Sequence, residues 1–117
     1  MHITYQLHIS LKKVQLITVG KLGTFEFKSG KYIYTGSARK NIHARVKRHL
    51  KSTKRLRWHI DYLLANPYSE IINVIYFDQS ECMVNQHVSG QITVKGFGAS
   101  DCKRGCISHL KFIDVLF

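Results

Sequence analysis

Residues 31–50, KYIYTGSARKNIHARVKRHL, place a strand-like run, a glycine turn and a basic helix within twenty positions. Residues 31–34 are typical of a strand, and Gly36-Ser37-Ala38 predicts a turn, because glycine permits a tight backbone at a strand end. Three aliphatic residues then recur every four positions and predict the buried stripe of a helix over 41–51: Ile42, Val46 and Leu50. A strand that leads directly into an amphipathic helix favours a mixed α/β domain.

The flanking segments also alternate strands and helices. We predict strands over residues 4–11, 14–19, 24–27, 70–77, 91–95 and 110–117. A second helix is predicted over 54–65 with an apolar face of Leu56, Ile60, Leu63 and Leu64, and a third over 80–88 capped by Ser80. The chain is therefore expected to be one small α/β domain of the α+β type over 1–117, with helices on a mainly antiparallel sheet.

Composition limits the partners. Hydrophobic residues make up 44% of the 117 positions, which suffices for a modest core, and no run approaches the roughly 20 apolar residues of a membrane helix. We expect a soluble, cytoplasmic protein that does not bind membranes. Eighteen Lys and Arg against seven Asp and Glu give a net charge of +11, which favours a polyanion as partner, although charge also serves solubility.

The basic residues cluster in and after the first predicted helix. Contacts to phosphate backbones are their natural role, and such contacts give salt-dependent affinity with little base specificity. The residues of this run are Arg39, Lys40, Lys47, Arg48, Lys51, Lys54, Arg55 and Arg57.

The three cysteines, an odd number, cannot all pair with one another and favour a reducing compartment. Cys102, Cys106 and His109 are metal-ligand types close in sequence, and Cys82 could add a fourth ligand to a zinc site. Structural zinc usually shows two tight ligand pairs, whereas only one loose cluster is visible here.

One motif combines Tyr34-Thr35-Gly36 at a strand end with a following helix that carries Arg45 and His49. It resembles the second half of the signature of the GIY-YIG nuclease superfamily. The rest resembles one branch, a small family of uncharacterised archaeal and bacterial proteins that are sometimes joined to endonuclease III-type repair glycosylases. The branch motifs are GKYIYTGSA (30–38), WHIDYLL (58–64), EC (81–82), GFGASDC (96–102) and SHL (108–110).

The resemblance implies a GIY-YIG-like domain that hydrolyses DNA phosphodiesters with one divalent metal. The matching catalytic positions are Tyr5, Tyr34, Arg45 and His49, and Glu81 matches the metal-binding glutamate. Mg²⁺ or Mn²⁺ would be the cofactor, and DNA repair with a repair-protein partner is implied by association.

The chemistry of these residues agrees with phosphodiester hydrolysis. A guanidinium and a divalent cation stabilise the extra negative charge of the transition state. Tyr5 or Tyr34 could serve as general base if positive charge lowers its pKa, and His49 could orient Tyr34 or relay the proton.

The first half of the signature departs from the family. Ile3-Thr4-Tyr5 replaces the usual glycine, and the interval from Tyr5 to Tyr34 exceeds the superfamily's usual spacing. A hairpin inserted within 11–30 would leave the strand ends in place. If the register differs, Tyr32 is the rival of Tyr5 and Tyr34.

A second cluster consists of His59, Asp61, Asp101 and His109. His59, Asp101 and His109 could line the cleft and bind metal or phosphate. Structural roles also suffice, with Trp58 in the core and Asp61 as a helix cap or the ion-pair partner of His59. Two functions stay open, an endonuclease on DNA or RNA and a non-cleaving nucleic-acid-binding module with structural zinc.

Overall fold

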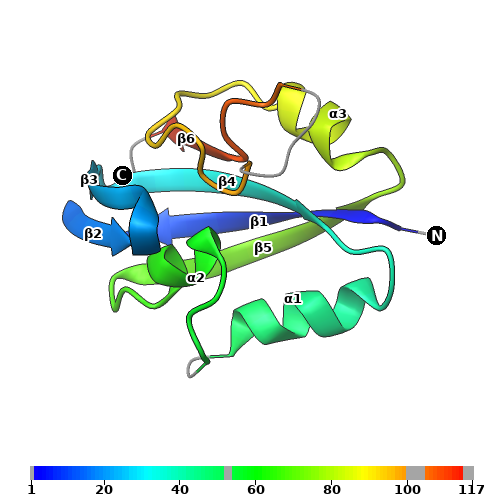
Figure 1. The fold of residues 1–117 in the computed structure, drawn as a ribbon, viewed down its shortest axis with the longest axis horizontal. Coiled ribbons are helices and arrows are strands. Elements are labelled where there is room, and N and C mark those ends of the chain that lie inside the picture. The colour runs from blue at the N-terminus through cyan, green and yellow to red at the C-terminus, as the bar shows by residue number, and fades with distance from the viewer. Residues whose placement is uncertain (1, 52–53, 100–104, 115–117) are drawn as a thin grey trace.

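The computed structural model describes residues 2–51, 54–99 and 105–114. Within these ranges the strands form an antiparallel sheet in the order β5-β1-β4-β6 and a separate hairpin, β2-β3 (Figure 1). The strands are β1 Thr4–Leu11, β2 Gln15–Val19, β3 Gly23–Phe27, β4 Gly30–Ser37, β5 Ser69–Phe77 and β6 Leu110–Asp114; the helices are η1 Gly20–Leu22, α1 Ile42–Leu50, α2 His59–Leu64 and α3 Glu81–Gln86. The predicted α+β class is confirmed.

Strand β1 lies inside the sheet and supplies the centre of the core. Its alternate residues Tyr5, Leu7, Ile9 and Leu11 are at most 1% exposed. Alternation along a strand directs all four side chains to one face. This face is covered by residues of the hairpin and of α1 and α2, namely Ile17, Val19, Phe27, Ile42, Val46, Ile60 and Leu63.

Helix α3 packs against the other face of the sheet. Met83 and Val84 of α3 line a groove together with Gln6, whose side chain alternates with that of Tyr5. In Figure 1, α1 lies below the sheet and α3 above it. Arg45 of α1 and Glu81 of α3 meet in one cleft at the end of the sheet where β1 begins and β4 ends.

The hairpin β2-β3 is an excursion between two paired strands. β1 pairs with β4 so that Tyr5 lies opposite Gly36 and Leu7 opposite Tyr34. The predicted insertion within 11–30 is thus confirmed. It explains how two tyrosines far apart in sequence lie on neighbouring strands.

The second helix begins later than predicted. The carboxylate of Asp61 accepts hydrogen bonds from the backbone N–H groups of Arg57 and Trp58, at 2.8 Å each, and so caps a helix that starts at His59. Residues 54–58 are not helical. Leu56, predicted on the buried face, is consequently 44% exposed.

Three other local predictions were wrong. Leu50 is 56% exposed, because His49, only 2% exposed, takes the last buried position of α1. The predicted strand 91–95 is reduced to an isolated bridge between Gln91 and Phe112. Gly36 and Ser37 belong to β4 rather than to a turn.

None of the helices in the described ranges has the length and apolar character needed to cross a membrane.

Candidate active site

A cleft of about 340 Å³ lies where β1 begins and β4 ends. Four of the five predicted catalytic and metal-binding residues line it: Tyr5 from β1, Tyr34 from β4, Arg45 from α1 and Glu81 from α3. The fifth, His49, is buried behind Tyr5. Ser37, Arg57, Trp58, His59 and Gly98 complete the lining.

Tyr5 and His49 form a buried hydrogen-bonded pair, with Tyr5 Oη 2.7 Å from His49 Nε2. Burial lowers the pKa of His49 to about 4, and nearby Arg48 and Lys54 act in the same direction against Asp61. His49 is therefore neutral at pH 7, and the direction of its hydrogen bond with the Tyr5 hydroxyl is set by which ring nitrogen carries the proton. The partner of His49 is thus Tyr5, whereas the sequence suggested Tyr34.

Burial raises the pKa of both tyrosines above the ordinary value. For Tyr5, burial is opposed by the Arg45 guanidinium, and Glu81 adds to the rise. For Tyr34, burial and the neighbouring Tyr5 and Glu81 raise the pKa. Both phenols are protonated at neutral pH, so either can accept a proton only if its own proton moves on or positive charge arrives.

Gly36 makes room for Tyr5. A Cβ atom at Gly36 would lie 2.5 Å from Tyr5 Oη, a distance that forces atoms to move. Gly98, at φ +66°, plays a similar part for Tyr34, since a Cβ there would lie 3.1 Å from its ring. The glycine of the Tyr34-Thr35-Gly36 motif therefore serves the packing of the cleft rather than a turn.

Ser37 is hydrogen-bonded to both Arg45 and Glu81. Its carbonyl oxygen accepts a hydrogen bond from Arg45 Nη1 at 3.0 Å, and its hydroxyl donates to Glu81 Oε2 at 3.1 Å. Sequence reasoning missed Ser37. The available signal was its place directly after Gly36, at the end of the strand that carries Tyr34.

Asp61 has a structural role. It is fully buried and accepts two hydrogen bonds from Arg48, at 2.9 and 3.0 Å, besides the backbone N–H groups of Arg57 and Trp58. Burial alone would raise the pKa of Asp61, but these hydrogen bonds outweigh it and hold the pKa below its ordinary value. Asp61 does not line the cleft, and its partner is Arg48 rather than the predicted His59.

Arg48, predicted as a nucleic-acid contact, has its own partners within the protein. Its guanidinium is held by Asp61 and lies 4.2 Å from the centre of the Trp58 ring. The Arg48 side chain is 25% exposed, so only part of it faces solvent. Trp58, predicted in the core, is half-buried and forms part of the cleft wall.

Two members of the predicted second cluster adjoin the cleft. His59 lines it, and its Nδ1 accepts the Gly98 backbone N–H at 2.9 Å. His109 is buried with Nδ1 3.3 Å from Glu81 Oε1. Asp61, described above, does not line the cleft, and Asp101 lies outside the described residues.

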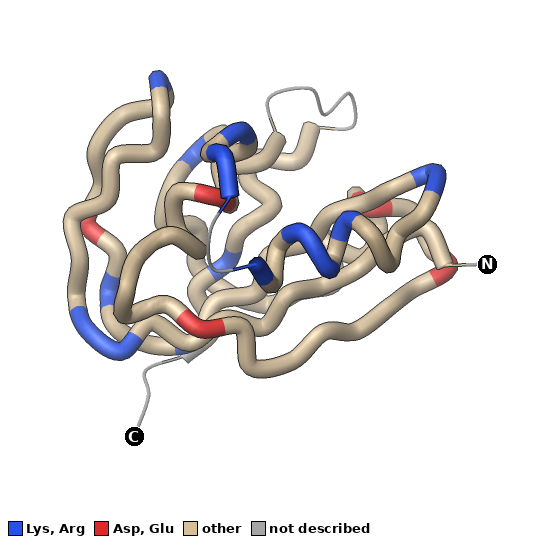
Figure 2. Tube along the Cα trace, turned by 90° about the horizontal axis from the view of Figure 1, so that it is seen from below, with Lys and Arg blue, Asp and Glu red and all other residues tan. Residues whose placement is uncertain are grey.

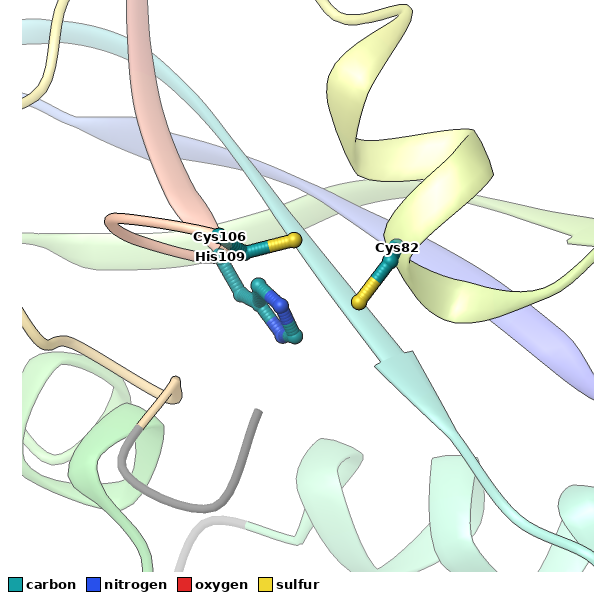
Figure 3. Close-up of side chains that lie close together, drawn as sticks. All are labelled: Cys82, Cys106 and His109. Atoms are coloured by element: carbon teal, nitrogen blue, oxygen red, sulfur yellow. The ribbon is translucent and has the colours of Figure 1, made fainter. Parts of the chain in front are cut away.

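The cysteine and histidine ligands predicted for zinc partly come together. Cys82, Cys106 and His109 each place one ligand atom within 4.8 Å of the others, a group that could hold a metal ion (Figure 3). Cys102, the remaining predicted ligand, lies outside the described residues.

A family model described as "Domain of unknown function DUF123" matches residues 4–116, which is nearly the whole chain. The chain belongs to the DUF123 family. No curated protein and no solved structure is similar enough to count as a match. The family description carries no activity, so the function of this DUF123 domain has to be argued from its cleft.

The basic residues of the DUF123 domain form a surface on and after α1, hereafter the basic surface. Figure 2 shows Lys and Arg along α1 and the segment before α2. Lys54 is only partly exposed, and its Nζ donates to the His49 and Lys51 carbonyl oxygens at 2.8 and 2.7 Å. The exposed members are Arg39, Lys40, Lys47, Lys51, Arg55 and Arg57.

Tyr32, the rival tyrosine, lies in the core of the DUF123 domain. Its hydroxyl donates to the Lys28 carbonyl oxygen at 2.6 Å, and its ring packs edge-on against Phe112. Tyr32 is not among the residues that line the cleft.

Proposed function

We propose that this DUF123 domain is a metal-dependent endonuclease of the GIY-YIG type that hydrolyses phosphodiester bonds in DNA. The observation that carries the proposal is the meeting of Tyr5, Tyr34, Arg45 and Glu81, from four separate elements, in one cleft. A cleft of about 340 Å³ beside a basic surface suits a backbone phosphate.

Glu81 fits the single divalent cation that the resemblance implies. Its side chain is 26% exposed at the cleft wall, and Mg²⁺ or Mn²⁺ prefers carboxylate oxygens together with water and phosphate. The bound cation would supply positive charge to the phosphate oxygens. The Ser37 hydroxyl donates to one carboxylate oxygen of Glu81 and so fixes the orientation in which the carboxylate would bind the cation.

Arg45 would stabilise the phosphate as its negative charge grows. Its guanidinium is anchored by the Ser37 carbonyl and lies 4.7 Å from the centre of the Trp58 ring. A donor fixed before the reaction needs no reorganisation during it, so its effect falls on the transition state. Removing one such donor typically costs about 10²–10³ in kcat.

Tyr5 and His49 would move the proton of the attacking water. Tyr5 is protonated in the resting site, so its oxygen accepts a proton only as its own proton passes to His49 Nε2, 2.7 Å away. His49 is neutral at pH 7, so it has a lone pair for this proton, but burial lowers its pKa to about 4 and makes it a weaker base than an exposed histidine. Tyr34 then packs beside Tyr5, with ring centres 6.5 Å apart, and shapes the pocket.

A second candidate is a nucleic-acid-binding module that does not cleave. The raised pKa of both tyrosines and the contacts of Glu81 with Ser37 and His109 favour it, because these groups are already satisfied within the protein. The basic surface would bind DNA or RNA in either case. The place in DNA repair, with a repair-protein partner, rests on the resemblance alone.

The test is cleavage of labelled single-stranded, double-stranded, flapped and junction DNAs, and of matching RNAs, with Mg²⁺ or Mn²⁺. We expect metal-dependent cutting that falls at least about 10²-fold in Arg45→Ala and Glu81→Gln while binding is retained. Glu26→Gln, an exposed glutamate on β3, is the matched control and should cut normally. Binding without cutting on every substrate would favour the second candidate. Cutting unaffected by both variants would reject the site.

A further inference from the structure

A second ligand cluster lies beside the cleft, built from two elements that are distant in sequence. Cys82 belongs to the first turn of α3, and Cys106 and His109 precede β6. Figure 3 shows the Cys82 sulfur directed from its helix toward Cys106 and His109. One ligand atom of each lies within 4.8 Å of the others, which small side-chain movements can bring to coordination distance.

The backbone around this cluster is held in place from several sides. The His109 N–H donates to the Phe97 carbonyl at 2.8 Å, and the His109 carbonyl accepts from the Thr35 N–H at 3.0 Å. On the other element, the Ser80 hydroxyl caps α3 by accepting the Met83 N–H at 3.3 Å. The ligands therefore stand on anchored backbone, as a binding site requires.

The donor atoms select the metal. Two thiols and one imidazole are ligands that zinc accepts readily, whereas Mg²⁺ and Mn²⁺ prefer oxygen. The cleft presents the Glu81 carboxylate and the cluster presents sulfur, so the two sites attract different ions. We propose that Cys82, Cys106 and His109 bind a zinc ion, with a fourth donor completing the tetrahedron.

The zinc ion would also act on the cleft, a consequence that rests on the proposed nuclease function. Glu81 directly precedes Cys82, and its Oε1 lies 3.3 Å from His109 Nδ1. If His109 held zinc, the Glu81 carboxylate beside its Nδ1 would orient the ring, as carboxylates commonly do for zinc-bound histidines. The ion would then connect α3 to the segment before β6, and His109 would be a positioning residue for Glu81.

The first experiment measures metal binding by the 117-residue chain, purified without chelators and kept reduced. We expect one zinc ion per chain by mass spectrometry of metals. Cobalt in its place should give an intense thiolate-to-cobalt charge-transfer band that zinc then abolishes. This readout needs no variant and no nuclease activity. No zinc uptake on titration, or a cobalt spectrum without thiolate bands, would overturn the proposal.

Variants assign the ligands. Cys82→Ser, Cys106→Ser and His109→Ala should each weaken zinc binding more than about 100-fold, and Glu81→Gln about 10-fold, since it changes only the partner of a ligand. His87→Ala is the matched control, because His87 is an exposed histidine on the border of α3. Unchanged zinc affinity in both cysteine variants would remove the site. If these variants do not fold, the wild-type cobalt spectrum still decides.

The coupling to the cleft has its own readout. Removing zinc with a chelator that leaves Mg²⁺ in solution should raise the Mg²⁺ concentration needed for half-maximal cleavage by about 10-fold, while binding of DNA persists. An unchanged Mg²⁺ requirement, with zinc shown to be lost, would limit the ion to a structural role. Zinc binding without any nuclease activity would reject the nuclease proposal and leave the zinc site standing.

Discussion

Two carboxylates of this domain, Asp61 and Glu81, have different surroundings although each lies near an arginine. Asp61 is fully buried and accepts four hydrogen bonds, two from Arg48 and two from backbone N–H groups. Glu81 is 26% exposed and has longer contacts, 3.1 Å to Ser37 and 3.3 Å to His109. A carboxylate saturated by the protein stabilises the fold, and one that still faces the cleft can bind a ligand.

The same contrast separates two arginines of α1. Both guanidinium groups lie over the Trp58 ring, but Arg48 is paired with the buried Asp61 carboxylate, whereas Arg45 donates to the Ser37 carbonyl and lines the cleft. The two residues are three positions apart, so their difference comes from the partners that tertiary packing supplies.

The largest expected effect compares the two carboxylates directly. Asp61→Ala should lower the free energy of unfolding by about 3–5 kcal/mol, because it leaves the Arg48 guanidinium and two backbone N–H groups without their acceptor. Glu81→Gln should change it by less than about 1 kcal/mol. Urea unfolding followed by circular dichroism measures both. Equal losses would show that the two carboxylates do not differ in role.

The next largest effect is a loss of stability in acid, which we attribute to His49, the buried histidine behind Tyr5. Its pKa is about 4 in the folded protein against 6.5 ordinarily, so between these values the unfolded chain binds more protons. Stability therefore falls as pH drops from about 6.5 to 4, by about 3 kcal/mol in all, and the lowered pKa of Asp61 adds a loss at still lower pH.

Urea unfolding from pH 7 to pH 4.5 measures this slope. His49→Gln, which keeps a hydrogen-bond acceptor for Tyr5, should flatten it. The control His43→Gln, an exposed histidine of α1, should retain it. A slope that survives in His49→Gln would mean that another group carries the acid sensitivity.

The arginines give a smaller effect on stability. Arg48→Ala should lower the free energy of unfolding by about 2–3 kcal/mol, because it leaves the buried Asp61 carboxylate without a counter-charge. The loss is smaller than for Asp61→Ala because the Arg48 side chain is partly exposed. Arg45→Ala should cost about 1 kcal/mol or less while cleavage falls. Thermal melts and cleavage assays on both variants separate the roles. Loss of cleavage in a fully folded Arg48→Ala protein, with Arg45→Ala active, would reverse the assignment.

The smallest effect is expected on the basic surface. Lys47→Ala and Lys51→Ala should each leave stability within about 0.5 kcal/mol and reduce the slope of log affinity for DNA against log salt by about 1. Lys21→Ala, an exposed lysine in η1, should leave the slope unchanged. Filter binding across a range of salt concentrations measures it. Slopes that match the wild type would place the DNA elsewhere.

Local sequence predicted much of the fold because local physics governs it. The four-residue repeat at Ile42 and Val46 predicted α1, and the strand patterns on either side of 11–30 predicted the inserted hairpin. The second helix was predicted correctly except for its start at residue 54, which was wrong because apolar periodicity does not show that the Asp61 carboxylate caps a helix beginning at His59. A capping residue at the third helical position was the signal available.

The sequence by itself determined most strands and helices, the basic charge and most of the residues that line the cleft. Only the tertiary structure decided their partners: His49 with Tyr5 rather than Tyr34, Arg48 with Asp61, and His109 with both Glu81 and the cysteines. Tyr5 and His49 are 44 positions apart. Contacts over such separations depend on strand register and helix packing, which no local pattern encodes.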